Sequence, residues 1–164
     1  MKSLFIGTRI EALKKLEELT EVVDIITTKG SYVDNYRDSK IIVTKKNKDE
    51  INSQIDKSDA DLILSSGYPY ILPNSLILDK KKLFINSHPS FLPFYKGRQC
   101  VKRAYENNES FYGSTLHYMS EEVDSGEIIY QKKVSLKNYS LDKIYQYLFT
   151  KCEIEVIEQG LKKI

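Results

Sequence analysis

Residues 83–98 read LFINSHPSFLPFYKGR, and this stretch decides the fold. Its apolar start predicts a buried β-strand that ends at His88, because the prolines at positions 89 and 93 lack the backbone N–H that a strand ladder needs. Strand side chains alternate between the two faces of a sheet, so Asn86 and His88 project from the same face. The stretch therefore predicts a carboxamide and an imidazole at the carboxyl end of one strand, where open α/β sheets bind their ligands. A lone histidine beside a proline is equally compatible with an ordinary turn histidine.

The beginning of the chain predicts a β-α-β unit. Residues 4–6 are apolar and predict a first strand, and residues 22–28 are rich in β-branched side chains and predict a second. The segment between them places apolar residues at helical spacing, namely Ile10, Leu13, Leu16 and Leu19. Because a helix connects the two strands, we expect them to run parallel.

Five more segments lead to the stretch quoted above. Residues 31–40 are polar and predict a surface loop, and residues 41–43 predict a short strand. Residues 45–58 predict an exposed helix, and residues 60–67 predict a buried strand. Residues 68–73 carry two tyrosines and two prolines, and they predict a stiff aromatic loop at the carboxyl end of that strand.

After the quoted stretch the pattern changes. Residues 99–107 predict a helix with Val101, Ala104 and Tyr105 facing inward. Residues 114–119 alternate as a strand, and residues 127–134 predict another strand that follows too soon for a crossover helix, so this pair is expected to be antiparallel. A helix capped by Ser140 is expected to close the chain, with one apolar stripe made of Leu141, Ile144, Tyr145, Leu148, Phe149, Cys152 and Val156.

Length and composition narrow the function. The chain has 164 residues, which suits a single domain over residues 1–164, and its net charge of +2 lacks the basic bias of a dedicated nucleic-acid binder. No apolar run is long enough to cross a bilayer and the first residues do not look like a signal peptide, so a cytoplasmic protein without a membrane partner is expected. The two cysteines are far apart in no metal spacing, which fits a reducing compartment and argues against a zinc site.

Three ordered motifs point to a family. The first runs Asn-x-His-Pro-Ser-x-Leu-Pro-x-Tyr-x-Gly from Asn86, the second runs Gly-x-Thr-x-His from Gly113, and the third runs Asp-x-Gly from Asp124. In this order and spacing they resemble the catalytic signature of the folate-dependent formyltransferases, among them glycinamide ribonucleotide transformylase, methionyl-tRNA formyltransferase and sugar N-formyltransferases. The resemblance implies a Rossmann-like three-layer α/β/α fold with a mostly parallel sheet and an antiparallel C-terminal strand pair.

The resemblance also implies the chemistry. 10-Formyltetrahydrofolate would donate a formyl group to an amine, with Asn86, His88 and Asp124 as the catalytic residues and no metal. Attack on the formyl carbon makes an oxyanion and an ammonium, so the site needs a hydrogen-bond donor and a path for protons. A carboxylate beside the imidazole favours its charged form. His117, Thr115 and Gly126 match the supporting motif positions, and His117 is expected to support Asp124 unless it is simply packed on its strand.

By the same resemblance, two loops would bind the pterin ring of the folate. They are the aromatic loop, expected beside the Asn86 and His88 strand end, and the loop before Asp124, with residues Tyr68, Tyr70, Ile71, Leu72 and Val123. Ile71 and Leu72 are equally compatible with an ordinary core position. Lys96 and Arg98 would bind a substrate phosphate or the glutamate tail of the folate, although Lys96 also fits a solvated lysine. Arg9 would substitute for a glycine-rich phosphate loop that is absent after the first strand.

The sequence leaves the acceptor open. We expect a primary amine on a small phosphorylated or nucleotide-linked molecule, with a nucleotide-linked amino sugar ahead of glycinamide ribonucleotide in purine biosynthesis. No room is seen for a tRNA-binding domain, so nucleic acid is not expected as a partner. A hydrolase acting on 10-formyltetrahydrofolate and a non-catalytic folate-binding module are the alternatives. The twelve tyrosines are compatible with a homodimer interface.

Overall fold

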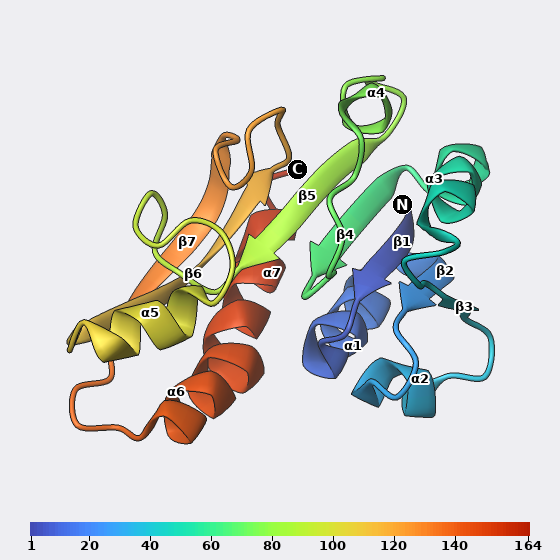
Figure 1. Ribbon diagram of the computed structural model, residues 1–164. Helices are drawn as coiled ribbons and strands as arrows, with labels where there is room; N and C mark the ends of the chain where they lie inside the picture. The colour runs from blue at the N-terminus through green and yellow to red at the C-terminus, as the bar shows by residue number, and fades with distance from the viewer. The chain divides into compact units, whose positions relative to one another are not determined.

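The computed structural model describes all residues, 1–164, and the chain divides into two compact units. Unit 1 comprises Met1–Ile85 and unit 2 comprises Asn86–Ile164 (Figure 1). The boundary falls inside strand β5 (Leu83–His88), directly before Asn86. The stretch that carries the first motif therefore opens unit 2.

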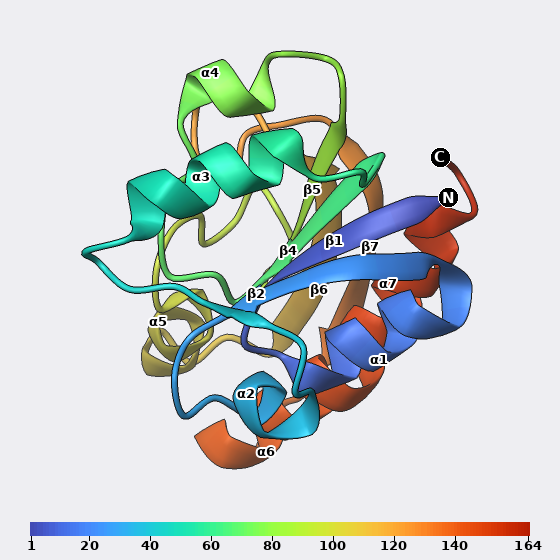
Figure 2. The same cartoon turned by 90° about the vertical axis from the view of Figure 1, so that its right-hand side faces the viewer.

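Unit 1 is built on four parallel strands. Their order is β3-β2-β1-β4, with bounds Lys2–Gly7 for β1, Glu21–Thr27 for β2, Ile41–Ile42 for β3 and Leu62–Ser66 for β4. Helices α1 (Ile10–Leu19) and α3 (Lys48–Lys57) lie on opposite faces of these strands (Figure 2). A parallel sheet covered on both faces needs nearly continuous apolar strands, and β4 is accordingly buried at every position.

Two short helices of unit 1 were not predicted from the sequence. The prediction of a loop over residues 31–40 is wrong in part, because Tyr32–Tyr36 form helix α2. The Ser31 side chain caps this helix by accepting a hydrogen bond from the Asp34 N–H at 3.1 Å. Helix α4 (Asn74–Ile77) follows the aromatic loop directly. Both helices are a single turn or little more, too short for an apolar period to show.

Unit 2 contains the antiparallel strand pair. Strands β6 (Phe111–Tyr118) and β7 (Ile128–Ser135) pair antiparallel, with a register shift between Leu116 and His117. The predicted combination of a mostly parallel sheet with an antiparallel C-terminal pair is thereby confirmed. Helix α5 (Cys100–Glu106) buries Val101 and Ala104 as expected, but Tyr105 is 41% exposed, and Cys100 takes the third inward position instead.

The last helical segment is interrupted. Helix α6 (Leu141–Tyr147) begins after Ser140, which accepts a hydrogen bond from the Lys143 N–H at 3.3 Å. A π-helical turn, η1 (Leu148–Cys152), then separates α6 from α7 (Glu153–Leu161), so the predicted single α-helix is wrong in detail. The predicted apolar stripe is nevertheless the inner face, with Ile144, Leu148, Cys152 and Val156 buried.

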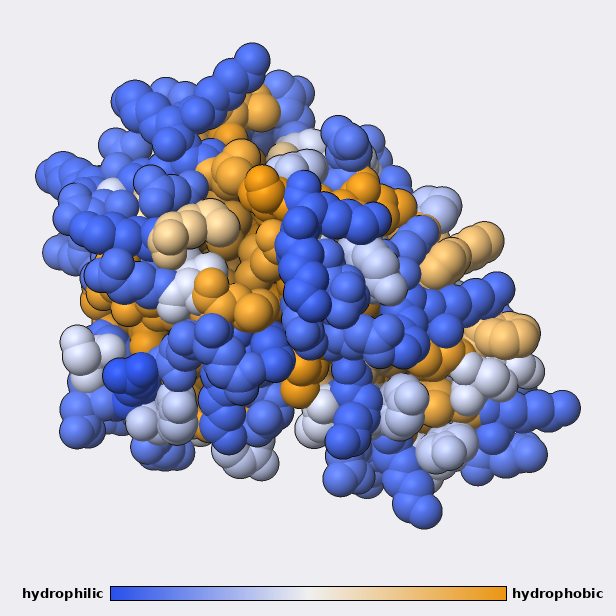
Figure 3. All heavy atoms as spheres, turned by 180° about the vertical axis from the view of Figure 1, so that it is seen from behind, coloured by the Kyte–Doolittle hydropathy of each residue, from blue (hydrophilic) through white to orange (hydrophobic).

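Most charged residues lie at the surface, but Glu153 is buried. Hydrophilic residues cover most of the face shown in Figure 3, with hydrophobic atoms visible between them. None of the helices has the length and apolar character needed to cross a lipid bilayer.

Candidate functional site

Four polar side chains of unit 2 form one cluster at the end of β5. The Nδ2 atom of Asn86 lies 3.2 Å from Nε2 of His117, and Nδ1 of His88 lies 3.4 Å from Oδ2 of Asp124. The other carboxylate oxygen of Asp124 lies 3.6 Å from Nε2 of His117. Residues from β5, β6 and the β6–β7 loop thus meet, and the structure brings together the three predicted catalytic residues and the predicted supporting histidine.

Backbone carbonyls decide where the two imidazoles carry their protons. Nε2 of His88 lies 2.9 Å from the Tyr95 carbonyl oxygen, which only accepts, so this nitrogen must donate. Nδ1 of His88 is therefore the atom that faces the Asp124 carboxylate. In the same way Nδ1–H of His117 donates to the Tyr118 carbonyl at 2.9 Å. In its neutral form His117 thus accepts from the Asn86 amide through Nε2 and fixes the orientation of that amide.

Asp124 is held in a constrained position. Its side chain is only 7% exposed, and its backbone adopts φ +55°, the left-handed region that non-glycine residues rarely occupy. Burial acts to raise the pKa of the Asp124 carboxyl. The neighbouring His117 imidazole, the positive charge of His88 and the Gly97 N–H, which donates to Oδ2 at 2.8 Å, together outweigh burial and lower that pKa below its usual value. Asp124 is therefore a carboxylate at neutral pH.

The loop after His88 is anchored to β6 and β7. The Thr115 hydroxyl donates to the Ser90 carbonyl at 2.8 Å and accepts from the Leu92 N–H at 3.1 Å. The Gln131 amide donates to the Leu92 carbonyl at 3.0 Å. Thr115 is fully buried, so these bonds are shielded from water. In the structure Thr115 therefore fixes the loop that follows His88, and its supporting role in catalysis stays a prediction.

Gly126 closes the loop that carries Asp124. A Cβ atom at this position would lie 1.7 Å from the Tyr118 carbonyl oxygen, a distance that no side chain can accept. The loop therefore passes directly against the end of β6, and only glycine permits that approach. The predicted supporting role of Gly126 is thus to allow a close backbone contact next to Asp124.

The predicted substrate-binding residues occupy different places. Lys96 and Arg98 are exposed in unit 2, and the Lys96 amine donates to the Ser125 hydroxyl at 2.8 Å, next to Asp124. Arg9 precedes α1 in unit 1, and its side chain lies against Gly67, where an added Cβ would come within 3.2 Å of it. An observed contact thus ties Lys96 to the loop of Asp124.

The residues predicted to bind the pterin ring differ in exposure. The rings of Tyr68 and Tyr70 pack edge to face with centroids 5.8 Å apart. The Tyr68 hydroxyl is buried without a hydrogen-bond partner, and burial raises its pKa to about 12. Leu72 is 5% exposed whereas Ile71 is 77% exposed, so the two adjacent residues do not share one environment. Val123 is about half exposed in its loop of unit 2.

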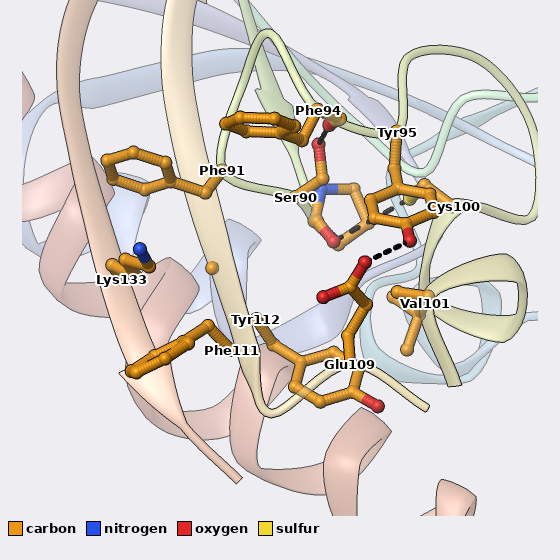
Figure 4. Close-up of a pocket in the computed structure, with 13 residues that line it drawn as sticks. Ser90, Phe91, Phe94, Tyr95, Cys100, Val101, Glu109, Phe111, Tyr112 and Lys133 are labelled. Atoms are coloured by element: carbon orange, nitrogen blue, oxygen red, sulfur yellow. Dashed lines mark hydrogen bonds between the residues drawn. The ribbon is translucent and has the colours of Figure 1, made fainter. Parts of the chain in front are cut away.

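A separate pocket lies on the other side of the loop after His88. It has a volume of about 180 Å³ and an aromatic lining that includes Phe91, Phe94, Tyr95, Phe111 and Tyr112 (Figure 4). The hydroxyl of Tyr95 donates to Glu109 at 2.6 Å. None of the four clustered polar residues lines this pocket. Tyr95 therefore contacts both features, since it lines the pocket while its carbonyl accepts a hydrogen bond from His88.

Sequence reasoning missed several contributors to the cluster. The Tyr95 carbonyl and the Gly97 N–H are backbone groups, and a backbone group has no residue type by which a pattern can recognise it. Both residues were nevertheless part of the first motif, so the motif marked the right segment. Gln131 looked like one more alternating strand residue and gave no signal of its own.

Comparison with known proteins supports one family. Residues 6–158 match the family model described as formyl transferase. The chain is 30% identical over 153 residues to the methionyl-tRNA formyltransferase of Listeria welshimeri, an alignment that covers 82% of this chain and 49% of that protein. It is 36% identical over 88 residues to the phosphoribosylglycinamide formyltransferase of Haemophilus influenzae, covering 54% of this chain and 42% of that protein. The chain spans about half the length of the curated relatives it matches.

Solved structures agree. The phosphoribosylglycinamide formyltransferase of Campylobacter jejuni superimposes with a TM-score of 0.83 and 25% identity, covering 99% of this chain and 96% of that chain. The corresponding enzyme of Anaplasma phagocytophilum gives a TM-score of 0.82 with 26% identity, covering 98% and 84%. A formyltetrahydrofolate deformylase from Pseudomonas syringae has the same fold, with a TM-score of 0.83, 22% identity and coverage of 98% and 59%.

Proposed function

Because the chain belongs to the formyl transferase family, we propose that it transfers the formyl group of 10-formyltetrahydrofolate to a primary amine. The observation that carries the proposal is the closed cluster of Asn86, His88, His117 and Asp124. It combines a carboxamide, two imidazoles of defined orientation and an ionised carboxylate in one buried place. Formyl transfer needs these groups together, whereas a module that only binds folate has no physical need for them.

The first chemical requirement is a donor for the developing oxyanion. When an amine attacks the formyl carbon, the carbonyl oxygen gains negative charge, and donors aimed at that oxygen lower the barrier. The Asn86 amide is oriented by His117, and His88 is oriented by the Tyr95 carbonyl. Donors fixed in advance need no reorganisation during the reaction, which is why such groups are worth roughly two to three orders of magnitude in rate.

The second requirement is a path for the proton that the attacking amine loses. Asp124 is ionised at neutral pH, because its pKa lies below the usual value, and it faces Nδ1 of His88. The carboxylate can take the proton and pass it toward the leaving nitrogen of tetrahydrofolate, directly or through water. His88 in its protonated form would donate from Nδ1, since Nε2 is already committed to the Tyr95 carbonyl.

The formyl donor requires a pocket with polar groups for the pterin ring. The Tyr68 hydroxyl in unit 1 is a buried donor without a partner, and a polar edge of a bound ring would satisfy it. The paired rings of Tyr68 and Tyr70 offer apolar surface of the kind that such a ring needs, whereas Leu72 is buried in the core. These features fit the donor. The contribution of Ile71 and Val123 remains a prediction.

We infer that the acceptor is a small amine that carries phosphate or a linked nucleotide. Lys96 and Arg98 are exposed cations in the segment that contacts the loop of Asp124, and Arg98 offers a two-pronged grip on phosphate. A nucleotide-linked amino sugar fits this description. Glycinamide ribonucleotide is the second candidate, and the similarity to phosphoribosylglycinamide formyltransferases favours it.

The test is a panel of acceptors with product analysis. The purified protein is incubated with 10-formyltetrahydrofolate and amino sugar nucleotides, glycinamide ribonucleotide or simple amines, and each amine is examined by mass spectrometry for an added formyl group. A formylated product with one acceptor supports the proposal and names the substrate. Formate release at equal rates with and without amines would contradict it and favour a hydrolase.

A further inference from the structure

We propose that Arg103 is a positioning residue for Asp124, which it holds through the turn formed by residues 95–99. The proposal rests on the proposed function of Asp124. Arg103 lies on helix α5 and does not touch the polar cluster itself. Its guanidinium group binds backbone carbonyls of the turn, and the turn in its observed conformation binds the Asp124 carboxylate.

The guanidinium group clamps the turn at three points. Nε of Arg103 donates to the Arg98 carbonyl at 3.0 Å, and an Nη donates to the Lys96 carbonyl. The guanidinium carbon also lies 5.7 Å from the centre of the Tyr95 ring, in range of a cation–π contact. Arg103 thus holds the residues on both sides of Gly97.

The turn needs such a clamp because its backbone is unfavourable. Tyr95 has φ +56°, Gly97 has φ +82° and Gln99 has φ +53°. Two of the three are not glycine, so the left-handed conformation is disfavoured there. Residues in such conformations persist only where the surroundings fix them. The two carbonyl hydrogen bonds to one guanidinium group are the side-chain contacts by which Arg103 restrains this turn.

The turn, held in this conformation, binds the Asp124 carboxylate. The Gly97 N–H donates to Oδ2 of Asp124 at 2.8 Å, and Oδ2 is also the atom that faces Nδ1 of His88 at 3.4 Å. The other charged or titratable groups around Asp124 are His117 from β6 and the Lys96 amine, which binds neighbouring Ser125. If the turn relaxes, Asp124 loses the one backbone donor among these groups and the restraint on its distance to His88.

The geometry of a guanidinium group suits this clamp. Arginine presents several N–H donors in a rigid planar fork, so it can serve two carbonyls while its face lies on a ring. A lysine at the same place keeps the charge but offers a point donor on a flexible stem. The pair of variants Arg103→Lys and Arg103→Met therefore separates the charge of the side chain from its geometry.

The experiment measures the Asp124 carboxyl directly. The titration of this group is followed by carbon-13 NMR in the wild type, in Arg103→Met, in Arg103→Lys and in the control Lys102→Met, and kcat is measured over pH for the same proteins. Lys102 is the adjacent residue of α5, and it forms an exposed ion pair with Glu106 at 3.8 Å. The titration needs no formyl donor, so it stands even if the chain catalyses a different reaction.

In Arg103→Met we expect the carboxyl to titrate at higher pH than in the wild type, since it loses the Gly97 N–H. The acidic limb of kcat should move to higher pH with it, and kcat should fall on the order of 10-fold to 100-fold with little change in KM. Arg103→Lys should resemble Arg103→Met, and Lys102→Met should resemble the wild type.

Several results would overturn the proposal. An unchanged carboxyl titration in a folded Arg103→Met protein would do so, as would full recovery in Arg103→Lys, because charge alone would then suffice. If Arg103→Met does not fold, the titration of Arg103→Lys decides in the same way. A shifted titration in a protein whose wild type transfers no formyl group would keep the positioning role and reject the proposed function.

Discussion

Strand β1 of unit 1 and strand β6 of unit 2 are both buried along most of their length, yet they differ in the types of side chain that they bury. The centre of β1 is Leu4, Phe5 and Ile6, which are essentially inaccessible to water. The centre of β6 contains Ser114, Thr115 and His117, which are buried just as deeply. Burying polar groups is unfavourable unless they are hydrogen-bonded. β6 buries three polar side chains, whereas β1 buries only Ser3, whose hydroxyl is paired with that of Thr20.

The backbone repeats this contrast. Six non-glycine residues have φ in the left-handed region, and unit 1 contains only Lys80. The other five lie in unit 2 and include Tyr95, Gln99 and Asp124, which belong to the polar cluster or to the turn that holds it. Strained backbone and buried polarity collect at functional sites. Unit 1 therefore follows local folding rules, whereas unit 2 departs from them at the polar cluster and at the turn that holds it.

The largest expected effect falls on the chemistry of unit 2. His88→Asn removes the imidazole that faces Asp124, and we expect formyl transfer to slow by on the order of 10³-fold. The free energy of unfolding should fall by only about 1–2 kcal/mol, since one buried hydrogen bond to the Tyr95 carbonyl is lost. Single-turnover kinetics and urea denaturation measure the two quantities. A His88→Asn variant that keeps more than a tenth of the wild-type rate would contradict the catalytic role of His88.

The next effect falls on the stability of unit 1. Leu64→Ala in β4 leaves a cavity at a fully buried position, and we expect it to lower the free energy of unfolding by about 3 kcal/mol. Activity per folded molecule should stay close to that of the wild type. Leu78→Ala is the matched control, because Leu78 is about half exposed and its truncation should change stability by about 0.5 kcal/mol or less. Equal losses in the two variants, measured by urea denaturation, would contradict the assignment of the core.

A smaller effect is expected where a loop touches the site. In Gly126→Ala the new Cβ would overlap the Tyr118 carbonyl, so the loop must shift and Asp124 with it. We expect a loss of roughly 10-fold to 100-fold in kcat. Gly30→Ala in unit 1 is the control, since nothing lies within 4 Å of its Cβ and only its φ of +78° is unfavourable. That control should lose about 1 kcal/mol of stability and no activity. A loss of kcat in Gly30→Ala would contradict the claim that Gly126→Ala acts through its position next to Asp124.

The smallest effect concerns stability and pH. A carboxylate whose folded pKa is lowered contributes stability above its unfolded pKa, and this contribution disappears as the pH falls through the folded value. Asp124 is such a group. We therefore expect the stability advantage of the wild type over Asp124→Asn to be present at pH 6 and to shrink as the pH falls below 3.8, the usual carboxyl value. Urea denaturation of both proteins at several pH values checks this. A stability advantage of the wild type that grew as the pH fell would contradict the prediction.

The contrast also explains how far the sequence alone could be interpreted. In unit 1 the strands and the two longer helices follow apolar periods, so pattern and structure agree except at helices α2 and α4. In unit 2 the side chains of the cluster were predicted by motif, but their partners were not. These partners depend on the backbone conformation of the turn over residues 95–99, which residue types do not predict. They are the Tyr95 carbonyl, the Gly97 N–H and the Arg103 clamp. The π-helical turn over Leu148–Cys152 was missed because its apolar stripe looks like that of an α-helix.

The central claim is that the polar cluster of unit 2 performs formyl transfer from 10-formyltetrahydrofolate to an amine. The most direct measurement is the release of tetrahydrofolate, followed by absorbance, for the wild type and Asp124→Asn with and without the acceptor. The account predicts release that depends on the acceptor and falls by two to three orders of magnitude in the variant. Equal rates of tetrahydrofolate release by both proteins, or a rate that does not depend on the acceptor, would contradict this claim.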